Sequence, residues 1–364
     1  MIDMSLQFRH FLPQMERPNM KYLCKLVPLL FLLTALGCNS TSPGKGSADQ
    51  TQPTPEDRLL ARQFEELTST MPGQRAQEIM NLFNETDPAA MRWAGFTTTN
   101  NTGPMALLRL KGILPTTPDQ LTQGRGVLKM MVEKLEMART NLPPAISVAR
   151  CQGGLTLDGT LDESAWQSAT VVPIPVCFRP WKARPGPPST VRLLWDTEYL
   201  YAGFDIVDRD ISARPFTRDD ESFVWDAAEV FLIGDLNLGL YWEICLTPTG
   251  GITDRWFYKF PRNWSGHCTL GRNITGLKRA IRLRGTANDP KDTDEGYTLE
   301  VAIPFAEVPG VRTPAAAGTT IQGLFAVSDL TGQAVVANVE YYSHVFTPVG
   351  FQDIWSFSTL TLMK

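Results

Sequence analysis

The sequence predicts a mainly β chain, in which a β-sandwich is preceded by a small helical region. From about residue 148 to residue 364, short β-branched and aromatic runs alternate with Gly, Pro, Asn and Asp clusters. Their roughly 8–12 residue spacing is typical of an antiparallel sandwich or barrel. Residues 56–145 instead carry apolar side chains at helical spacing, as in Leu59, Phe64 and Leu67. The composition, 43 % hydrophobic and 20 % charged, is that of a folded chain.

Residues 1–37 have the organisation of a secretory signal peptide. A short basic start at Met20 precedes an apolar run, Val27–Gly37, which is shorter than the roughly 20 residues of a transmembrane helix. Ala35-Leu36-Gly37-Cys38 resembles the lipobox of bacterial lipoproteins, which implies cleavage before Cys38 and lipidation of its sulfur. A plain signal peptide with an incidental cysteine is the alternative, and Met20 competes with Met1 as the true start.

Residues 38–55 predict a flexible tether, because they are small, polar and rich in Pro and Gly. Several acyl chains on Cys38 would anchor this tether to a membrane, since each buried CH₂ contributes about 0.8 kcal/mol. In Gram-negative lipoproteins an Asp after the cysteine favours inner-membrane retention. Asn39 at that position therefore implies the outer membrane, on its periplasmic or surface-exposed face.

Three helices are expected in the region 56–145. The first begins with acidic residues after Pro55, which suit the positive end of a helix dipole. The second spans Gln74–Phe83, and the third spans Thr117–Arg139 with a Pro-containing cap. Because no chemical motif occurs here, we expect a spacer or a docking unit for a protein partner.

Strands are expected throughout the β region. They are 191–195, 199–207, 228–233, 241–246, 271–278, 280–285, 297–303, 320–327 and 356–362. Asp196–Glu198 is short enough to join the first two as a hairpin. Thr249–Thr269 is expected to be a long loop that forms one wall of a site. Its candidate wall residues are Arg255, Trp256, Arg262 and Trp264.

Five blocks of the β region, in the right order, resemble carbohydrate-binding module family 9 and its relatives. The blocks are Leu157–Trp166, Leu194–Tyr201, Asp226–Leu232, Gly285–Pro304 and Phe357–Leu362. The first, for example, resembles the family opening I-D-G-x-L-D-E-x-x-W. The likeness runs from about Gln152 to the C-terminus and implies a β-sandwich with jelly-roll-like topology, in agreement with the strand pattern.

The resemblance also implies where a sugar would bind. In founding members two Trp rings sandwich the terminal sugar, and the matching positions here are Phe223 and Phe351. Trp225 and Trp355 are candidates to replace these platforms, because sugar C–H faces stack on aromatic rings. Core packing is the alternative role of each.

Carboxylates supply the polar part of the implied site. Glu229 matches a family glutamate that binds sugar hydroxyls, with Asp226 beside it, and Glu243 stands where the family has an arginine. Ionised groups suit hydroxyls because charge-assisted hydrogen bonds are the stronger ones. Two pairs, Asp226 with Glu229 and Glu243 with Glu300, are those that a glycoside hydrolase would use.

No catalytic residue is predicted. The sequence lacks Gly-x-Ser-x-Gly, phosphate-loop and His-Glu-x-x-His motifs and has only three His. A net charge of −4 weighs against a nucleic-acid partner. We therefore expect non-catalytic binding of a poly- or oligosaccharide at the cell envelope. The alternatives are a structural or protein-docking lipoprotein that has lost sugar binding and, more weakly, a glycoside hydrolase or accessory module in carbohydrate catabolism.

Structural Ca²⁺ is the one cofactor considered. The turn after Gly285 offers oxygen ligands from Asp289, Asp292 and Asp294, and Ca²⁺ takes six to eight oxygens. Members of the resembled family often hold structural calcium, although a solvated turn is the alternative.

Cysteine usage suits an exported, oxidising compartment. The cysteines after Cys38 are Cys151, Cys177, Cys245 and Cys268. Four cysteines allow three connectivities, of which Cys151–Cys177 with Cys245–Cys268 is the weakly preferred one.

Overall fold

The structure is a computed structural model of the chain. It describes residues 52–70, 103–177, 184–213, 218–220, 222–258, 267–331, 339–347, 351 and 353–364. The expected signal peptide, Cys38, most of the tether and the helix expected over Gln74–Phe83 lie outside these residues. In the described parts, no helix is both long enough and apolar enough to cross a membrane.

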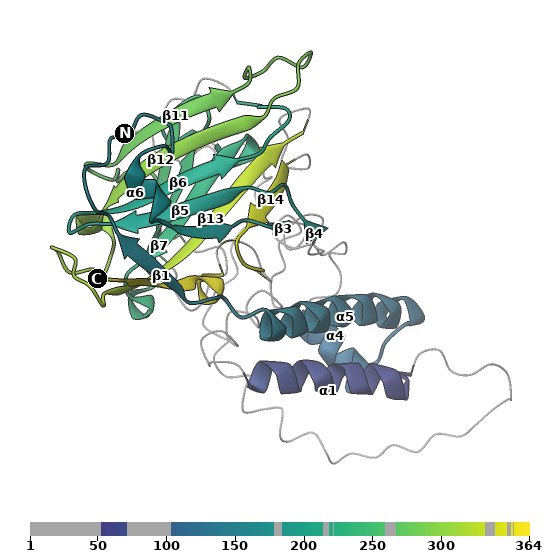
Figure 1. The fold of residues 1–364 in the computed structure, drawn as a ribbon. Helices are drawn as coiled ribbons and strands as arrows, with labels where there is room; N and C mark the ends of the chain where they lie inside the picture. Colours follow the sequence, from purple (N-terminus) through teal and green to yellow (C-terminus); the bar gives the residue numbers. More distant parts are fainter. Residues whose placement is uncertain are drawn as a thin grey trace, which may run out of the picture. The chain divides into compact units, whose positions relative to one another are not determined.

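Three helices precede the strands: α1 (Pro55–Ser69), α4 (Gly103–Leu110) and α5 (Pro118–Thr140) (Figure 1). They share a small apolar core, to which α1 contributes Phe64 and α5 contributes Leu128. The expected cap of α5 is present, because Gln120 N donates to Thr117 Oγ1 at 3.3 Å and Thr117 N donates to Gln120 Oε1 at 3.1 Å.

An ion pair between a buried aspartate and a partly exposed arginine ties α1 to α5. Arg125 Nε and Nη2 donate to the two carboxylate oxygens of Asp57 at 2.6 and 2.9 Å. The same carboxylate accepts the N–H of Thr54 at 3.0 Å and so completes a capping box at the start of α1. The hydrogen bonds from Arg125 are the main reason that the pKa of Asp57 is lowered.

The β region begins at Ile146, and residues 141–145 connect it to the end of α5 at Thr140. Its strands are β1 (Ile146–Arg150), β2 (Thr170–Pro173), β3 (Val176–Cys177), β4 (Arg184–Pro185), β5 (Thr190–Trp195), β6 (Tyr199–Ile206), β7 (Ala227–Ile233), β8 (Leu240–Leu246), β9 (Ile252–Tyr258), β10 (His267–Thr269), β11 (Lys278–Arg284), β12 (Gly296–Pro304), β13 (Thr320–Leu330), β14 (Val339–Ser343) and β15 (Ser358–Leu362). Short helical turns are α6 (Ser164–Gln167), η4 (Ser222–Val224), η5 (Leu236–Leu238), η6 (Phe305–Glu307) and η8 (Ile354–Ser356).

These strands form two sheets that share β1. Sheet A runs β10-β9-β8-β7-β13-β15-β1, with β14 on β13, and sheet B runs β1-β5-β6-β12-β11, with β2 on β5. Strand β1 pairs in parallel with β15 of sheet A and with β5 of sheet B. The expected hairpin at Asp196–Glu198 joins β5 to β6 in antiparallel register.

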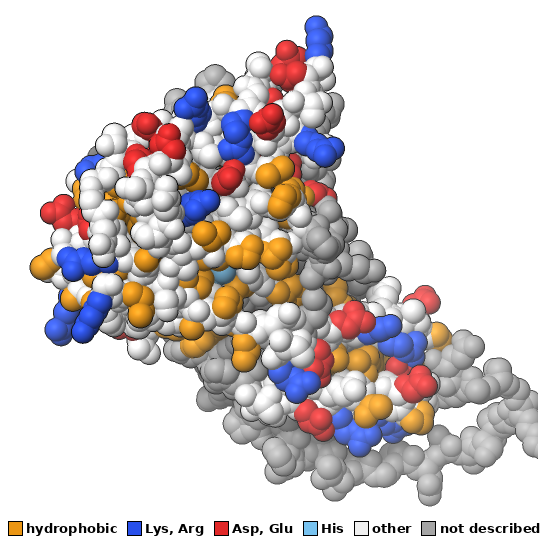
Figure 2. Space-filling model, in the orientation of Figure 1, with side chains coloured by type: hydrophobic (Ala, Val, Ile, Leu, Met, Phe, Trp, Pro, Cys, Tyr) orange, Lys and Arg blue, Asp and Glu red, His pale blue; other side chains and the backbone are white. Residues whose placement is uncertain are grey.

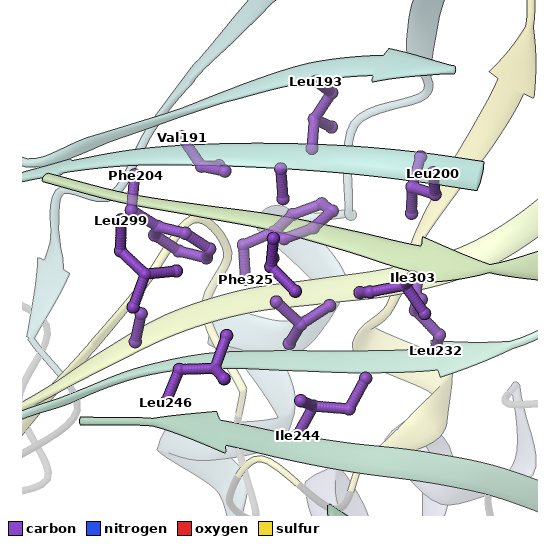
Figure 3. Close-up of a cluster of buried hydrophobic side chains, with 14 of the residues drawn as sticks. Val191, Leu193, Leu200, Phe204, Leu232, Ile244, Leu246, Leu299, Ile303 and Phe325 are labelled. Carbon is purple, nitrogen blue, oxygen red and sulfur yellow. The ribbon is translucent and has the colours of Figure 1, made fainter. Parts of the chain in front are cut away.

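The core lies between the two sheets (Figure 3). Alternate residues of each strand point into it, such as Leu193 of β5, Phe204 of β6, Leu232 of β7, Leu299 of β12 and Phe325 of β13. This arrangement confirms the predicted mainly β fold class and the sandwich. On the face shown in Figure 2, acidic and basic side chains are interspersed.

Two expectations about the strands were wrong. Residues 271–277 form no strand, since β11 begins at Lys278, and the expected long loop Thr249–Thr269 contains β9 and β10. Trp256 of β9 is buried and packs edge-on against Trp242 at 4.7 Å between ring centroids. It therefore belongs to the core rather than to the wall of a site. Of the other expected wall residues, Arg262 and Trp264 lie outside the described residues.

The preferred disulfides were also wrong, because Cys151 and Cys245 are free. Cys245 lies opposite Thr253 of β9, whereas Cys268 lies on the other edge of β9, opposite Phe257. Positions 253 and 257 are four residues apart, which is about 13 Å along a strand. Disulfide-bonded Cα atoms are only about 4.4–6.8 Å apart. Cys151 likewise pairs its backbone with Trp195 of sheet B, while Cys177 lies in sheet A.

Residues of two family-like blocks attach the segment around Asp158–Trp166 to the outer side of sheet B through hydrogen bonds. The buried Glu300 carboxylate of β12 accepts the N–H groups of Asp158 at 2.8 Å and Gly159 at 2.7 Å. It also accepts the indole N–H of Trp166 at 2.9 Å. Gly159 has φ +91°, and a Cβ there would lie 2.7 Å from the backbone of Ile281. These residues therefore hold the fold together.

Candidate functional site

The face of sheet A that points away from the core carries several buried polar side chains, among them Glu229 and Glu243 of the expected site. Because side chains alternate along a strand, Glu229 points to this outer face while its neighbours Ala228 and Val230 enter the core. The register places Cys245 of β8 directly opposite Glu229, and Arg255 of β9 directly opposite Glu243. We call this set the carboxylate face: Glu229, Glu243, Cys245, Arg255 and Ser328.

An aromatic cluster continues along the same face. Tyr241 of β8 stacks on Phe257 of β9 at 4.9 Å between ring centroids. Phe231 of β7 meets the edges of Phe351 at 5.8 Å and Phe357 at 6.0 Å. The C-terminal segment thus covers one end of the outer face with rings, next to the carboxylate face.

Glu243, one of the two glutamates on the carboxylate face, forms an ion pair with Arg255. Arg255 Nη1 donates to Glu243 Oε1 at 3.0 Å, and both side chains are largely buried. Arg255 was not predicted as the partner of Glu243, because residues 249–269 were expected to form a loop and not a strand. Residues 252–258, Ile-Thr-Asp-Arg-Trp-Phe-Tyr, do not alternate between apolar and polar, so the sequence carries no clear signal that would have placed Arg255 opposite Glu243.

No ion pair of this kind is formed by Glu229 among the described residues. Its side chain is 2 % exposed, and Oε1 has no hydrogen-bond partner among the described residues. Burial, and then the charge of Glu243, raise the pKa of Glu229 to about 8. Burial also raises the pKa of the Cys245 thiol. At neutral pH the face therefore presents a protonated carboxyl group, able to donate and to accept a hydrogen bond, beside an ion pair.

The aromatic candidates occupy different places. Phe223 lies in η4, which packs against β8 and β13, and its side chain lies outside the described ones. Phe351 is 6 % exposed and packs edge-on against Phe231 and Tyr341, so it is part of the aromatic cluster and not an open platform. Trp225 and Trp355 are half-buried, and the indole nitrogen of Trp355 is buried without a hydrogen-bond partner among the described residues.

Asp226 does not join Glu229. They are three positions apart, so their side chains point to opposite faces of sheet A. Asp226 is 0 % exposed, and its Oδ1 accepts Leu330 N–H at 2.7 Å while Oδ2 accepts Ser212 N–H. Its expected contact with sugar hydroxyls is thus replaced by two backbone hydrogen bonds at the rim of the sandwich.

Neither carboxylate pair considered for glycoside hydrolysis faces across a shared cleft. Asp226 and Glu229 lie on opposite faces of sheet A. Glu243 lies on the outer face of sheet A, whereas Glu300 lies on sheet B and is occupied by Asp158, Gly159 and Trp166.

The expected calcium ligands are not gathered into one group. Asp294 accepts Ile211 N–H and Thr286 N–H, each at 2.7 Å, and Asp289 accepts Lys291 N–H at 3.0 Å. Asp292 is exposed. Among the described residues, the carboxylates close enough together to share an ion come from other positions, Asp208, Asp226 and Asp329. The acidic turn therefore braces loops through Asp294 instead of forming the expected site.

One family model matches part of the chain. Residues 157–238 match the model described as carbohydrate family 9 binding domain-like. This stretch includes β5, β6, β7 and Glu229. No curated protein matches the sequence.

Solved structures with a similar fold include a family 9 carbohydrate-binding module from Caldicellulosiruptor kristjanssonii in complex with cellotriose. It has 16 % identity and a TM-score of 0.42, over 60 % of this chain and 93 % of that one. The glucose complex of a family 9 module from the same organism has 15 % identity and a TM-score of 0.41, over 59 % of this chain and 95 % of that one. A Bacteroides uniformis protein described as a candidate for carbohydrate binding has 14 % identity and a TM-score of 0.46, over 60 % of this chain and 99 % of that one.

Proposed function

We propose that the carboxylate face of sheet A binds carbohydrate without catalysis. The observation that carries this proposal is that the matched family region, residues 157–238, contains Glu229. On this face Glu229 lies next to the buried Glu243–Arg255 pair. Buried polar groups of this kind, at the edge of an aromatic cluster, suit a ligand that has many hydroxyls and an apolar ring face.

In the proposed complex each part of the face has its own task. The protonated Glu229 donates to one sugar oxygen and accepts from another hydroxyl. Arg255 and Glu243 fix two further hydroxyls with charge-assisted hydrogen bonds. Trp225 and Trp355, which are half-buried, offer ring surface to the sugar C–H groups, and the unpaired Trp355 indole N–H is a donor. Glycan ends and oligosaccharides are the ligands we propose.

Titration calorimetry on the full chain tests this proposal, with glucose, cellotriose and then a glycan array as ligands. Loss of a partner that leaves a buried hydrogen-bonding group unsatisfied costs about 1–3 kcal/mol, so Glu229→Ala should weaken binding roughly 5- to 150-fold. Tyr199→Ala is the matched control, because Tyr199 is a half-buried aromatic residue of sheet B and should leave affinity unchanged. Binding of no glycan would refute the proposal and favour a protein-docking lipoprotein, whereas release of sugar would favour a hydrolase.

We also propose that the protein is held at the cell envelope, in the outer membrane, by a lipid on Cys38. Support comes from the sequence, in the lipobox-like Ala35–Cys38 and the small polar tether that follows it. Incorporation of labelled palmitate and recovery in the membrane fraction test it. Both should be lost in Cys38→Ala and kept in Cys24→Ala, which changes the cysteine ahead of the apolar run; equal labelling of the two variants would contradict the anchor.

A further inference from the structure

The polar groups of the carboxylate face are largely closed off from solvent. Glu229 is 2 % exposed, Glu243 is 3 % exposed, and Cys245 and Ser328 are each 0 % exposed. A sugar hydroxyl cannot reach groups that are buried to this degree. A ligand that forms hydrogen bonds with them must therefore displace a part of the chain that covers them.

Part of this cover is the segment that leads into β7, residues 222–226, which we call the η4 segment. Its helix η4 packs against β8 and β13. Because β7 lies between β8 and β13 in sheet A, a segment that contacts both strands crosses β7 and Glu229. Ser222 is 1 % exposed, and its hydroxyl lies near the Cys245 thiol of β8. The η4 segment therefore lies on the carboxylate face.

Hydrogen bonds to the sandwich fix the chain on both sides of η4. Before the η4 segment, the hydroxyl of Thr253 in β9 donates to Asp220 O. At the end of the segment, Asp226 Oδ1 accepts the N–H of Leu330 in β13 at 2.7 Å. These two points are anchors about which the residues between them can move.

The part between the anchors is closed by short-range hydrogen bonds and follows a strained residue. Ser222 N donates to Asp220 O at 2.8 Å, and Trp225 N donates to Ser222 O at 3.0 Å, so neither bond ties the segment to a strand. Asp219 has φ +69°, a left-handed conformation that is strained for residues other than Gly. Strain of this kind clusters at ligand clamps and switch regions.

Closure leaves buried oxygen atoms without hydrogen bonds. Glu229 Oε1, Ser328 Oγ and Ser222 Oγ have no hydrogen-bond partner among the described residues. The Ser328 hydroxyl lies near the Glu229 carboxyl group but does not complete a hydrogen bond to it. Buried polar atoms are normally paired, and each unpaired one destabilises the arrangement that buries it. The closed arrangement is therefore easier to open than a fully paired one, and a ligand rich in hydroxyls would supply the missing partners.

We propose that the η4 segment is a lid over the carbohydrate site, and that a sugar hydroxyl enters beneath it to pair with Glu229 and Ser328. This inference rests on the proposed binding of carbohydrate to the carboxylate face. In the open form the lid swings away from β8 and β13 about its anchors at Asp220 and Asp226. Trp225 belongs to the lid, so one of the proposed ring contacts moves together with the cover. Binding is then limited by opening of the lid as well as by contacts with the sugar.

Reactivity of the Cys245 thiol measures opening of the lid without any ligand. A thiol reagent reaches this buried sulfur in the full chain only when the cover moves, and peptide mass spectrometry separates Cys245 from the other cysteines. The labelling rate should change little in dilute urea, because a local opening exposes little surface. A rate with the full urea dependence of global unfolding would overturn the lid.

Two matched variants locate the opening. Thr253→Val removes the hydroxyl that holds Asp220, and loss of this hydrogen bond should speed Cys245 labelling roughly 2- to 12-fold. Thr298→Val removes a hydroxyl of the same kind on sheet B, which donates to Gly159 O, and should leave the labelling rate unchanged. Equal rates in the two variants would contradict the lid, whether both rise or neither does.

A disulfide lock tests whether ligand entry needs the opening. Ser222→Cys places a second thiol beside Cys245, so oxidation ties η4 to β8. The oxidised variant should bind cellotriose, or the glycan that an array identifies, at least 10-fold more weakly than the same protein after reduction. Ser69→Cys adds an exposed thiol on α1 and should bind equally in both states.

The outcomes separate the lid from the proposed function. Equal binding before and after reduction, in a Ser222→Cys chain whose disulfide is confirmed by mass spectrometry, overturns the lid and leaves carbohydrate binding standing. If the unmodified chain binds no glycan, the proposed function fails, and the labelling of Cys245 still decides whether the η4 segment opens.

Discussion

Replacement of Glu229 by Gln should make the stability of the sandwich less sensitive to pH. Gln has nearly the same shape but does not titrate. In the folded protein the pKa of Glu229 is raised to about 8 from its ordinary 4.5, because the carboxyl group is buried beside Glu243. The folded state therefore holds the proton more tightly than the unfolded state does. Stability from this proton is fully present below about pH 4.5 and is lost as the pH rises through about 8.

The size of this effect follows from the two pKa values. A gap of this size corresponds to about 5 kcal/mol of unfolding free energy, of which we expect at least about 3 to be measurable. Urea unfolding followed by tryptophan fluorescence at about pH 5, 7 and 9 gives that free energy. The unmodified chain should lose stability across this range, while Glu229→Gln should lose clearly less. The exposed Glu295→Gln is the control and should follow the unmodified chain.

Parallel curves for Glu229→Gln and the unmodified chain would refute this reasoning. They would mean that Glu229 is ionised at neutral pH in the folded protein, with Arg255 shared between two carboxylates. The hydrogen-bonding roles proposed for the carboxylate face would then have to be reassigned, because Glu229 would only accept.

Three further outcomes are expected. Glu300→Gln should destabilise the sandwich by about 2–4 kcal/mol, since an amide cannot accept all three of the N–H groups that Glu300 now accepts, and thermal unfolding should show a Tm lower by roughly 5–15 °C. His344 is buried with its pKa lowered to about 4, so its stabilising effect is present above pH 6.5 and is lost as the pH falls toward 4; His344→Asn should flatten the acid limb of a Tm-against-pH curve. Asp57→Ala removes the cap of α1 and the partner of Arg125, and hydrogen exchange should show faster opening of α1 by about 10- to 100-fold, whereas Glu56→Ala should not.

Local sequence patterns predicted the architecture because they depend on neighbours along the chain. Runs of β-branched and aromatic residues placed β5, β6, β7 and β8, and the short hairpin at Asp196–Glu198 followed from loop length alone. Strand β9 was missed because both of its faces carry charge. Asp254 points to one side and pairs with Arg218, while Arg255 points to the other and pairs with Glu243. Each partner lies on another segment, so the sequence around β9 gives no sign of it.

The candidate site was predicted in part for the same reason. Glu229 and Glu243 share a face with Arg255, as two neighbouring strands allow. Asp226 was placed with Glu229 because they are close in sequence, although a spacing of three along a strand puts side chains on opposite faces. The aspartates that do meet are 18 and 103 residues from Asp226, at Asp208 and Asp329. The pairing of β7 with β13 and the packing of the sheet that holds β6 against them bring the three together.

The sharing of β1 between the two sheets has a mechanical consequence for a chain that is pulled from its N-terminal side. The strand follows the helical region directly and is held on one edge by Leu360–Leu362 and on the other by Leu194 and Trp195, in parallel register on both. Tension along β1 loads both ladders in shear, so their hydrogen bonds must break together and cannot open one by one. Resistance to forced unfolding is governed by the rate of that step. The first strand of the sandwich therefore passes a load from the helical region into both sheets at once.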